Sequence, residues 1–328
     1  MDVKISVIIP VYNVGNYIVK TIESLNNQTF KDFEVIVVND GSTDNSKKVT
    51  VDNLEKYDLN YTIINKDNQG VSIARNIGID KSKGEYIYFL DGDDYVEPTF
   101  LEKLYSYTSS NGVDIAFCGY THLNAKDNYS EAARVHKYID KIIDGREAAA
   151  RMLRSEFWIS AISGFYRRDF IEENNLRFPT DIKFGEDTVF IIKTLMNSKR
   201  VGCVKEPLVN YVRRSSSVTK TPSDTYYNLY ESDIRILNYN QETIKDKEIE
   251  EALITYHIPR NIIRIFSTMA KGGGDKEKLI TFIKKDEIAG YLKKFKTPSK
   301  KFKVAAIVIL KFPTIAFLIL NFKLKIKN

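Results

Sequence analysis

Short apolar runs alternate with amphipathic stretches through the first third of the chain. The apolar runs are rich in β-branched and aromatic residues and predict strands at 5–11, 33–38, 61–65, 86–90 and 114–120. Polar and apolar positions recur with helical spacing between them and predict helices at 17–26, 42–54, 71–81 and 99–109. Strands that alternate with helices are typical of βαβ units. We therefore expect a Rossmann-type, mostly parallel sheet flanked by helices on both faces.

The pattern changes after the first 144 residues. The predicted elements are a helix at 145–154, an aromatic stretch at 157–166, a helix from residue 186, strands at 200–204 and 208–212, a loop at 213–223, and helices at 226–246 and 249–269. The glycines at 272–274 indicate a linker, and residues 304–322 are almost wholly apolar. We predict a domain over 1–222 with halves of about 1–120 and 121–222, a helical region at 223–292, and a basic apolar tail at 293–328.

The chain has the composition of an ordinary globular protein, with 43% hydrophobic and 28% charged residues. Its two cysteines, Cys118 and Cys203, have no CxxC spacing, which argues against a zinc site and fits a reducing compartment. The first residues do not follow the pattern of a signal peptide, so a cytoplasmic location is expected.

Positive charge is concentrated at the end of the chain. Residues 271–328 hold 15 Lys, no Arg and four acidic residues, a net charge of +11, which leaves −5 for the rest of a chain whose total is +6. A basic tail on an acidic body is typical of a nucleic-acid arm or of contact with anionic lipid. The absence of Arg from this tail weighs against nucleic acid, because Arg is favoured in phosphate recognition.

Polar motifs follow three of the predicted strands. The first strand leads into PVYN (residues 10–13), the second into NDGSTD (39–44), and the fourth into DGDD (91–94). Because ligands bind at the carboxyl ends of parallel strands, these motifs are expected at one site. Capped turns use the same residue types, so the first two motifs have a purely structural alternative. The sequence has neither GxGxxG nor GxxxxGK[ST] at these positions, which disfavours a dinucleotide fold or a P-loop.

The DGDD motif carries the strongest chemical signal. Asp91, Asp93 and Asp94 directly follow an apolar strand, and the motif contains no Lys or Arg. Adjacent carboxylates repel one another, and a hard divalent cation such as Mn²⁺ or Mg²⁺ relieves that repulsion while bridging to phosphate oxygens. A further motif, NQGVSIARN at 68–76, opens a helix that carries Arg75, an arrangement suited to a diphosphate and equally to an ordinary helix start.

An acidic pair, Glu186 and Asp187, begins a later helix in the motif GEDTVF (185–190). Acidic residues favour the positive end of the helix dipole, so this pair alone would be unremarked. Together, PVYN, VNDGSTD, NQGVSIARN, YFLDGDD and GEDTVF resemble, in order and spacing, the family 2 inverting glycosyltransferases of the GT-A fold. The resemblance covers about residues 4–220 and is greatest to bacterial capsule and exopolysaccharide enzymes.

The resemblance implies roles for individual residues. Asp40 would contact the nucleotide base beside Pro10, Val11 and Tyr12; Asp91, Gly92 and Arg75 would hold the rest of the nucleotide; Asp93 would bind the metal; and Asp187 would be the catalytic base. Asn68, Asp94 and Glu186 are supporting candidates. The implied activity is metal-assisted single displacement from a nucleotide sugar, expected to be a UDP-sugar, to a hydroxyl of a glycan or polyprenyl-linked acceptor.

Three other residues have candidate roles. Arg213 and Arg214, in the Ser-rich segment after the last strand, could close over the diphosphate, or could lie in an ordinary solvated loop. Trp158 could stack on an acceptor sugar, or could pack in the core.

The apolar segment within this tail, residues 304–322, is interrupted only by Lys311 and Pro313. Lysines lie on both sides of it, which disfavours a clean membrane span and favours an anchor lying in the plane of an anionic surface. The alternatives are a core helix and a helix that forms a homo-oligomer. A non-catalytic sugar-nucleotide-binding or scaffolding role in polysaccharide assembly is the alternative to the enzyme, although the presence of both Asp93 and Asp187 argues against it.

Overall fold

The computed structural model describes residues 3–125, 130–135, 137–213 and 223–325. The chain divides into two compact units. The first consists of residues 1–148, 157–181 and 186–215, and the second of residues 149–156, 182–185 and 216–328. The domain limits expected from the sequence remain a prediction.

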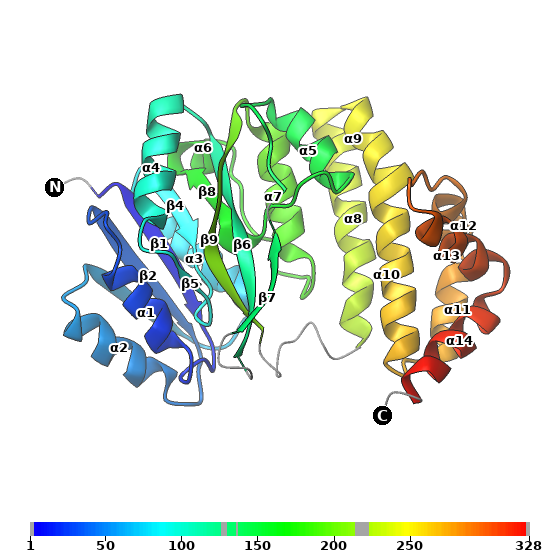
Figure 1. Cartoon of the computed structure of the whole chain (residues 1–328), viewed down its shortest axis with the longest axis horizontal. Coiled ribbons are helices and arrows are strands. Elements are labelled where there is room, and N and C mark those ends of the chain that lie inside the picture. The colour runs from blue at the N-terminus through cyan, green and yellow to red at the C-terminus, as the bar shows by residue number, and fades with distance from the viewer. Residues whose placement is uncertain (1–2, 126–129, 136, 214–222, 326–328) are drawn as a thin grey trace. The chain divides into compact units, whose positions relative to one another are not determined.

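The described part of the first unit is built on a mixed sheet (Figure 1). Its strands are β1 (Ile5–Val11), β2 (Phe33–Asp40), β3 (Tyr61–Lys66), β4 (Tyr86–Phe89), β5 (Tyr95–Val96), β6 (Ile115–Asn124), β7 (Ser130–Val135), β8 (Gly164–Arg167) and β9 (Val201–Arg213). They run in the order β3-β2-β1-β4-β8-β6-β9-β5, with β7 paired to β6. As predicted, β1 to β4 pair in parallel. The second half is mixed, because β8 enters antiparallel between β4 and β6.

Helices cover both faces of the parallel half. Those up to residue 197 are α1 (Ile18–Asn26), α2 (Ser46–Lys56), α3 (Val71–Lys81), α4 (Phe100–Asn111), α5 (Gly145–Leu153), α6 (Arg168–Glu173) and α7 (Glu186–Asn197). In Figure 1, α1 and α2 lie on the viewer's side of the strands. Burial on both faces explains why β1 and β2 are almost continuously apolar rather than alternating.

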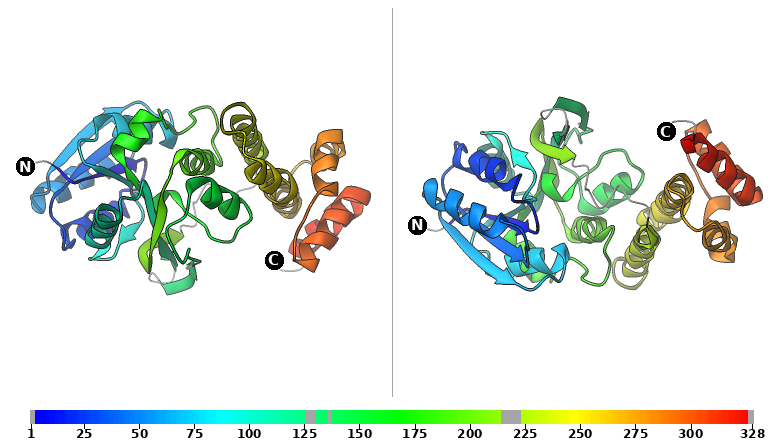
Figure 2. Two further views of the ribbon diagram at one scale, coloured as in Figure 1. Left: turned by 90° about the horizontal axis from the view of Figure 1, so that it is seen from above. Right: turned by 90° about the horizontal axis from the view of Figure 1, so that it is seen from below.

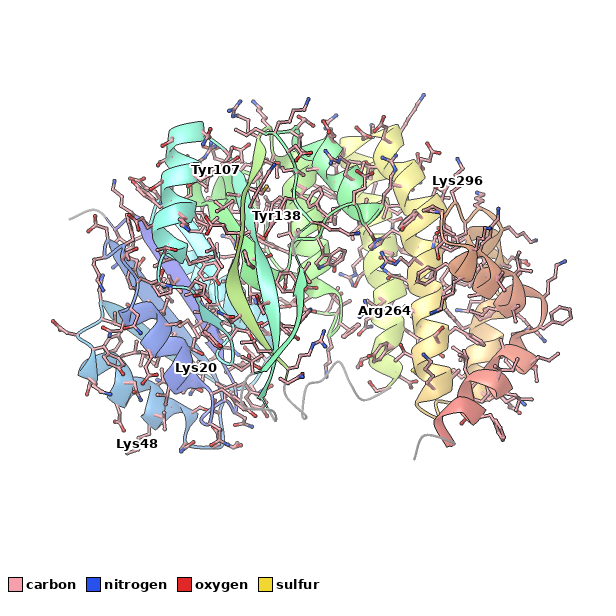
Figure 3. All side chains as sticks on the ribbon, in the orientation of Figure 1. Lys20, Lys48, Tyr107, Tyr138, Arg264 and Lys296 are labelled. Carbon is pink, nitrogen blue, oxygen red and sulfur yellow. The ribbon has the colours of Figure 1, made fainter. Side chains whose placement is uncertain are left out.

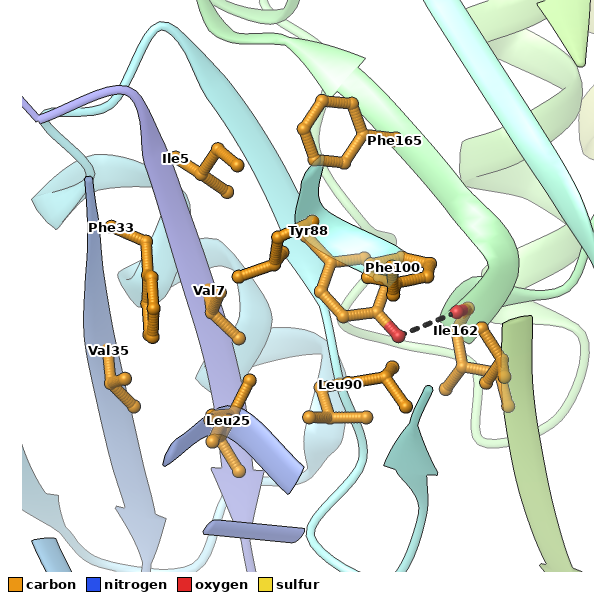
Figure 4. Close-up of a cluster of buried hydrophobic side chains, with 14 of the residues drawn as sticks. Ile5, Val7, Leu25, Phe33, Val35, Tyr88, Leu90, Phe100, Ile162 and Phe165 are labelled. Carbon is orange, nitrogen blue, oxygen red and sulfur yellow. Dashed lines mark hydrogen bonds between the residues drawn. The ribbon is translucent and has the colours of Figure 1, made fainter. Parts of the chain in front are cut away.

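Side chains alternate between the two faces of β1, and each face has its own core. Ile5 and Val7 belong to a cluster that includes Leu25 of α1 and Phe100 of α4 (Figure 4). Within it, the buried hydroxyl of Tyr88 donates a hydrogen bond of 2.9 Å to the carbonyl of Ile162, so the ring can be fully buried with its polar atom satisfied.

Helix α3 packs closely on the opposite face of β1, beside Ile8. A Cβ on Gly78 of this helix would lie 2.2 Å from Cγ2 of Ile8, so a side chain there would push the helix away from the sheet.

Strand β9 differs from the prediction. The two strands expected at 200–204 and 208–212 are one continuous strand that pairs in parallel with β6, with register shifts around Gly119. A bulge of this kind lets one strand bend and continue where the sequence pattern indicates a break.

The described part of the second unit consists mainly of helices. They are α8 (Asn228–Tyr239), α9 (Lys247–Ala252), α10 (Ile258–Lys271), α11 (Lys276–Lys284), α12 (Asp286–Lys293), α13 (Lys300–Lys311) and α14 (Pro313–Lys325), with π-helical turns at Asn240–Ile244 and Leu253–His257. Helix α10 contacts α8, α11, α12, α13 and α14, and Figure 2 shows α8 and α10 side by side.

The apolar segment 304–322 lies in two helices rather than one. Helix α13 ends at Lys311 and α14 begins at Pro313, because proline cannot continue the hydrogen-bond pattern of the preceding helix. In the described part of the chain, no helix has both the length and the apolar character needed to cross a bilayer.

Candidate functional site

The carboxyl ends of β1, β2, β3 and β4 lie at one edge of the sheet, and the three polar motifs meet there. Val11 lies opposite Asn39 across β1 and β2, and Asp40 lies opposite Lys66 across β2 and β3. Loops from four parallel strands therefore line a single edge, the usual position of a ligand site in α/β sheets.

Asp40 is buried at this edge and organises the loop after β3. Its carboxylate forms an ion pair with Lys66 and accepts hydrogen bonds from the backbone N–H groups of Gln69 (2.9 Å) and Gly70 (2.8 Å). Because three partners converge on one carboxylate, its position and that of the loop before α3 depend on each other.

Close packing at Gly41 joins the loop after β2 to the loop after β3. The backbone of Gly41 has φ +71°, and a Cβ there would lie 2.7 Å from the backbone nitrogen of Asn68. On the other side, the side-chain oxygen of Asn13 accepts hydrogen bonds from the N–H groups of Thr43 (2.9 Å) and Asp44 (3.3 Å). The loops after β1, β2 and β3 are therefore held together by direct contacts.

The PVYN motif supplies the loop after β1 in this group. Val11 is buried and Pro10 is half-buried, whereas the side chain of Tyr12 is 49% exposed. A large exposed aromatic ring at a ligand-binding edge offers a flat surface on which a planar group can stack. Asn68 is also exposed here.

The DGDD turn does not present its carboxylates as one cluster. Asp94 is buried, and its Oδ1 accepts a hydrogen bond of 2.7 Å from the backbone N–H of Val212, so it fixes β9 to the turn. Asp91 receives a hydrogen bond of 2.8 Å from Arg75. Asp93 is half-buried. Gly92 packs closely on the segment that leads into α1, since a Cβ on Gly92 would lie 3.0 Å from Cγ2 of Val14.

Arg75 links the two acidic regions of the sequence. Its guanidinium is buried, forms an ion pair with Asp91, and lies 3.5 Å from Glu186 through Nη1. It also lies over the ring of Phe178, 5.1 Å from the ring centroid. Burial lowers the pKa of this group, but the charges of Asp91 and Glu186 outweigh burial and raise it above the usual value, so Arg75 stays charged.

Glu186 and Asp187 begin α7 and face this arginine. Burial, and then the charge of Asp187, raise the pKa of Glu186 to about 7, while Arg75 opposes the shift. Asp187 is half-buried, and its Oδ1 accepts a hydrogen bond of 2.7 Å from the N–H of Thr188. Two carboxyl groups with different environments therefore stand side by side at the helix start.

Tyrosines line the same region. Burial, then the carboxylates of Asp94, Asp91 and Asp93, raise the pKa of Tyr211. Burial and then Asp187 raise the pKa of Tyr120 to about 12. The charge of Asp91 in the DGDD turn also raises the pKa of Glu186 on α7, so the two acidic regions belong to one electrostatic environment, which is dominated by negative charge.

The described residues contain no group of three or more acidic, His or Cys side chains that could hold a metal ion by themselves. This is consistent with the contacts of Asp94 and Asp91, which point to Val212 and Arg75. Mg²⁺, however, is usually bound by one or two carboxylates together with phosphate oxygens of the substrate and water. The residues present therefore fit an ion that binds together with a diphosphate, and they do not fit a preformed metal cage.

Of the remaining sequence candidates, Arg213 and Trp158 lie among the described residues. Arg213 ends β9 and is exposed. Burial, and then the charge of Arg213, lower the pKa of His122 to about 4, and the same charge opposes the rise in the pKa of Tyr120 and Tyr211. Trp158 is half-buried, between the buried Phe157 and Ile159. Arg214 lies outside the described residues.

Sequence reasoning missed two residues of the network. Lys66 pairs with Asp40 across β2 and β3, and its place directly after the strand predicted at 61–65 was the signal that could have found it. Phe178 packs on Arg75, and its backbone exchanges two hydrogen bonds of 2.8 Å with the side chain of Asn76 on α3. The LRFP segment around Phe178 contains no chemical group that would have indicated this.

A GT-A-like α/β sheet with acidic loops at the carboxyl ends of its strands, and a second acidic pair at a helix start, defines a class of protein: the glycosyltransferases. The chain belongs to Glycosyl transferase family 2, whose profile matches residues 6–177, more than half of its length. This agrees with the resemblance inferred from the sequence motifs.

Curated relatives are bacterial glycosyltransferases. The chain is 33% identical over 227 residues to the uncharacterized glycosyltransferase EpsJ of Bacillus subtilis, an alignment that covers 66% of this chain and 63% of EpsJ. It is 34% identical over 199 residues to the poly(ribitol-phosphate) β-N-acetylglucosaminyltransferase TarP of Staphylococcus aureus, covering 60% of this chain and 58% of TarP. The chain thus spans less than two thirds of the length of either protein.

The fold also matches a solved structure. Residues 1–349 of TarS from Staphylococcus aureus, in complex with UDP-GlcNAc, superpose with a TM-score of 0.70 at 18% identity, over 97% of this chain and 89% of that one. At this identity the match supports the fold, and the roles of individual residues rest on the geometry above.

Proposed function

We propose that this glycosyltransferase moves a sugar from a UDP-sugar to a hydroxyl group of a glycan or lipid-linked acceptor, with inversion at the sugar and with Asp187 as the base. The observation that carries the proposal is the position of Arg75, which contacts both Asp91 of the donor-side turn and Glu186, the neighbour of Asp187. One buried side chain thus links the proposed donor site to the proposed base.

The nucleotide would bind at the edge formed by β1, β2 and β3. The exposed ring of Tyr12 would face the base, and Asp40 would keep the loop of residues 67–70 in the shape that receives it. Asp91 would face the ribose, with Gly92 allowing close approach of the backbone. TarS binds UDP-GlcNAc in its solved complex, and TarP is by its name an N-acetylglucosaminyltransferase, which favours a uridine donor here.

Asp93 would hold a divalent cation, Mn²⁺ or Mg²⁺, together with the diphosphate. Such an ion supplies charge stabilisation to the leaving diphosphate. Asp94 acts indirectly, because its bond to Val212 fixes the turn that carries Asp93. The excess of carboxylates over buried arginine at this edge would repel a free diphosphate, so a cation is needed for the two to meet.

Asp187 would accept the proton of the acceptor hydroxyl. Its Oδ1 is oriented by the N–H of Thr188, so we assign the proton to Oδ2. Burial and the charge of Asp187 raise the pKa of Glu186 although Arg75 opposes the shift, so Glu186 would hold a proton and Asp187 would receive the proton of the acceptor. A single base suffices, since a diphosphate stabilised by a cation leaves without being protonated.

The acceptor would be presented at the inner face of the cell membrane. The basic apolar tail supports this proposal, because its exposed residues could dock on anionic lipid while nucleotide sugars arrive from solution. Capsule or exopolysaccharide synthesis is the process this setting suggests, in keeping with the resemblance noted in the sequence.

The test is a panel of UDP- and GDP-sugars. Each is assayed for thermal stabilisation of the protein and for its own hydrolysis, with Mn²⁺, with Mg²⁺ and with EDTA. We expect a UDP-sugar with metal to stabilise the protein. Asp93→Asn should remove both the stabilisation and turnover, because a neutral amide binds divalent ions poorly. Asp52→Asn, an exposed carboxylate on α2, is the matched control and should behave like the unsubstituted protein. Full activity in EDTA would contradict the metal.

A further inference from the structure

The outward side of α13 and α14 is apolar. Eight large apolar side chains are exposed along these two helices: Phe302, Val304, Ile307, Phe312, Ile315, Leu318, Ile319 and Phe322. We call these eight residues the apolar platform. Several large exposed apolar side chains on two helices that contact each other usually mark an interaction site.

The apolar platform is distinct from the side of these helices that packs in the core, because each helix also has a buried side. Ala306 and Ile309 of α13, and Ala316 and Phe317 of α14, are each at most 5% exposed. The outward residues of α14, by contrast, recur at positions 315, 318, 319 and 322, the spacing of one helix face, and each is at least half exposed. Helix α14 is thus apolar on both sides, and its outer side has no cover within the described residues.

The charge around the platform identifies its partner. From residue 288 to the end, the sequence has ten lysines and no aspartate or glutamate. Lys300, Lys301 and Lys303 are exposed in the first turn of α13, and Lys311 is exposed at its end. Lys296, labelled in Figure 3, is paired with Glu251, so the described lysines beside the platform are not all available to a partner.

We propose that the apolar platform binds the surface of an anionic lipid bilayer, with α13 and α14 lying in its plane and the lysines contacting headgroups. Apolar side chains among lysines suit the boundary between acyl chains and anionic headgroups. A second copy of the chain would bring the same positive charge against itself, which costs energy. This inference deepens the proposed function by naming the surface that holds the acceptor. The presence of the acceptor at that surface rests on the proposed function, whereas the binding of the apolar platform to lipid does not.

The helices are too short to span a membrane. Helix α13 has 12 residues and α14 has 13, or about 18–20 Å each at a rise of roughly 1.5 Å per residue, against a hydrocarbon core of about 30 Å. The break at Pro313 prevents them from joining into one span. Helices of this length can bind in the plane of the bilayer surface. Ala316 and Phe317 can then stay packed within the helical unit.

The test is flotation of the full chain with vesicles of phosphatidylcholine, with and without phosphatidylglycerol. The first variant combines Ile315→Ser, Leu318→Ser and Phe322→Ser, which change outward side chains and leave the buried side intact. The second combines Lys300→Gln, Lys301→Gln and Lys303→Gln. Its control combines Lys47→Gln, Lys81→Gln and Lys141→Gln, three exposed lysines of the first unit, and so removes the same charge elsewhere.

We expect binding to the anionic vesicles that weakens with added salt. The lysine variant should bind about fivefold more weakly for each lysine removed, its control should bind as the unsubstituted protein does, and the serine variant should lose binding at every salt concentration. Unchanged thermal unfolding would show that the variants are folded. Equal binding to uncharged vesicles, or dimerisation in sedimentation that the serine variant abolishes, would overturn the proposal.

Hydrolysis of the UDP-sugar, measured without vesicles, separates the two proposals. Hydrolysis without vesicle binding would contradict the membrane surface and leave the proposed chemistry standing. Vesicle binding without hydrolysis of any nucleotide sugar would contradict the proposed chemistry and leave the membrane surface standing.

Discussion

At the scale of single residues, Asp187 is the side chain whose removal should affect turnover most specifically. Asp187→Asn keeps the hydrogen bond to Thr188 but cannot take a proton, so turnover should fall by about 10²–10⁴ with little change in donor affinity. Single-turnover rates and donor binding measured separately check this. Asp169→Asn, an acid in the first turn of α6, is the control and should be nearly neutral. If donor affinity collapses instead, Asp187 is a donor ligand and the base lies elsewhere.

Glu186 makes stability depend on pH. Its pKa is about 7 in the folded protein against an ordinary value of 4.5, so between these values the folded protein retains a proton that the unfolded chain has lost. Stability should therefore fall as pH rises from about 4.5 to about 7 and change little from this cause above it. Glu186→Gln should flatten this slope and stabilise the protein at pH 8 by roughly 1–3 kcal/mol, since a neutral amide can still accept from Arg75.

Urea unfolding at pH 5 and pH 8 measures this effect, with the exposed Glu242→Gln as control. Equal destabilisation of Glu186→Gln at both pH values would show that Glu186 is ionised in the folded protein and that its ion pair with Arg75 is stabilising.

How far single residues could be predicted from the sequence depends on whether their partners lie in the same motif. The acidic residues of DGDD and GED were identifiable because each follows a recognisable strand or opens a helix. The contact of Arg75 with Asp91 and Glu186 joins three segments distant in sequence, so it appears only once α3, β4 and α7 are packed together. The sequence indicated Arg75 as a phosphate ligand; its burial makes it a link between carboxylates.

At the scale of elements, glycine at the end of β2 determines the shape of the donor edge. Gly41→Ala adds a Cβ where φ is positive and where the backbone of Asn68 is 2.7 Å away. Gly112→Ala, at the end of α4, also adds a Cβ where φ is positive (+57°), but no atom would lie within 4 Å of that Cβ. The control should lose roughly 1–2 kcal/mol from backbone strain alone.

Gly41→Ala should lose more, and should also weaken UDP binding, because the loop that Asp40 holds must move. Chemical unfolding and UDP titration of both variants check this. Equal losses of stability with unchanged UDP affinity would show that the contact at Asn68 is not needed for the donor edge.

Elements were predictable where they are long and regular. The first four strands and α1 to α4 match the expected positions within a few residues, since each has a full period of apolar spacing. Strands β5, β7 and β8 were missed because they contain 2, 6 and 4 residues, too few for β5 and β8 to show alternation, and β7 (SEAARV) lacks a β-branched run. Antiparallel pairing of β8 depends on tertiary contacts with β4 and β6, which no local pattern encodes.

At the scale of the whole molecule, the charge asymmetry of the sequence coincides with the division into two units. The proposed donor, metal and base residues all lie in the first unit, and the basic helices lie in the second. The sequence indicated an apolar, basic tail; it could not show which side of that tail is buried, because α14 is apolar around most of its surface.

Truncation after Pro298 tests how independent the two units are. Removing α13 and α14 uncovers α10, which contacts both, and takes away the buried Ile309 and Phe317. At ~2 kcal/mol for each large buried side chain, the second unit should lose on the order of several kcal/mol and unfold at a lower temperature. Stabilisation by UDP with metal, and hydrolysis of the donor, should persist, because every proposed donor and metal residue precedes the cut. Differential scanning calorimetry with and without UDP measures both effects. Loss of UDP stabilisation in a truncated chain whose first unit remains folded by circular dichroism would show that the donor site requires the helical unit.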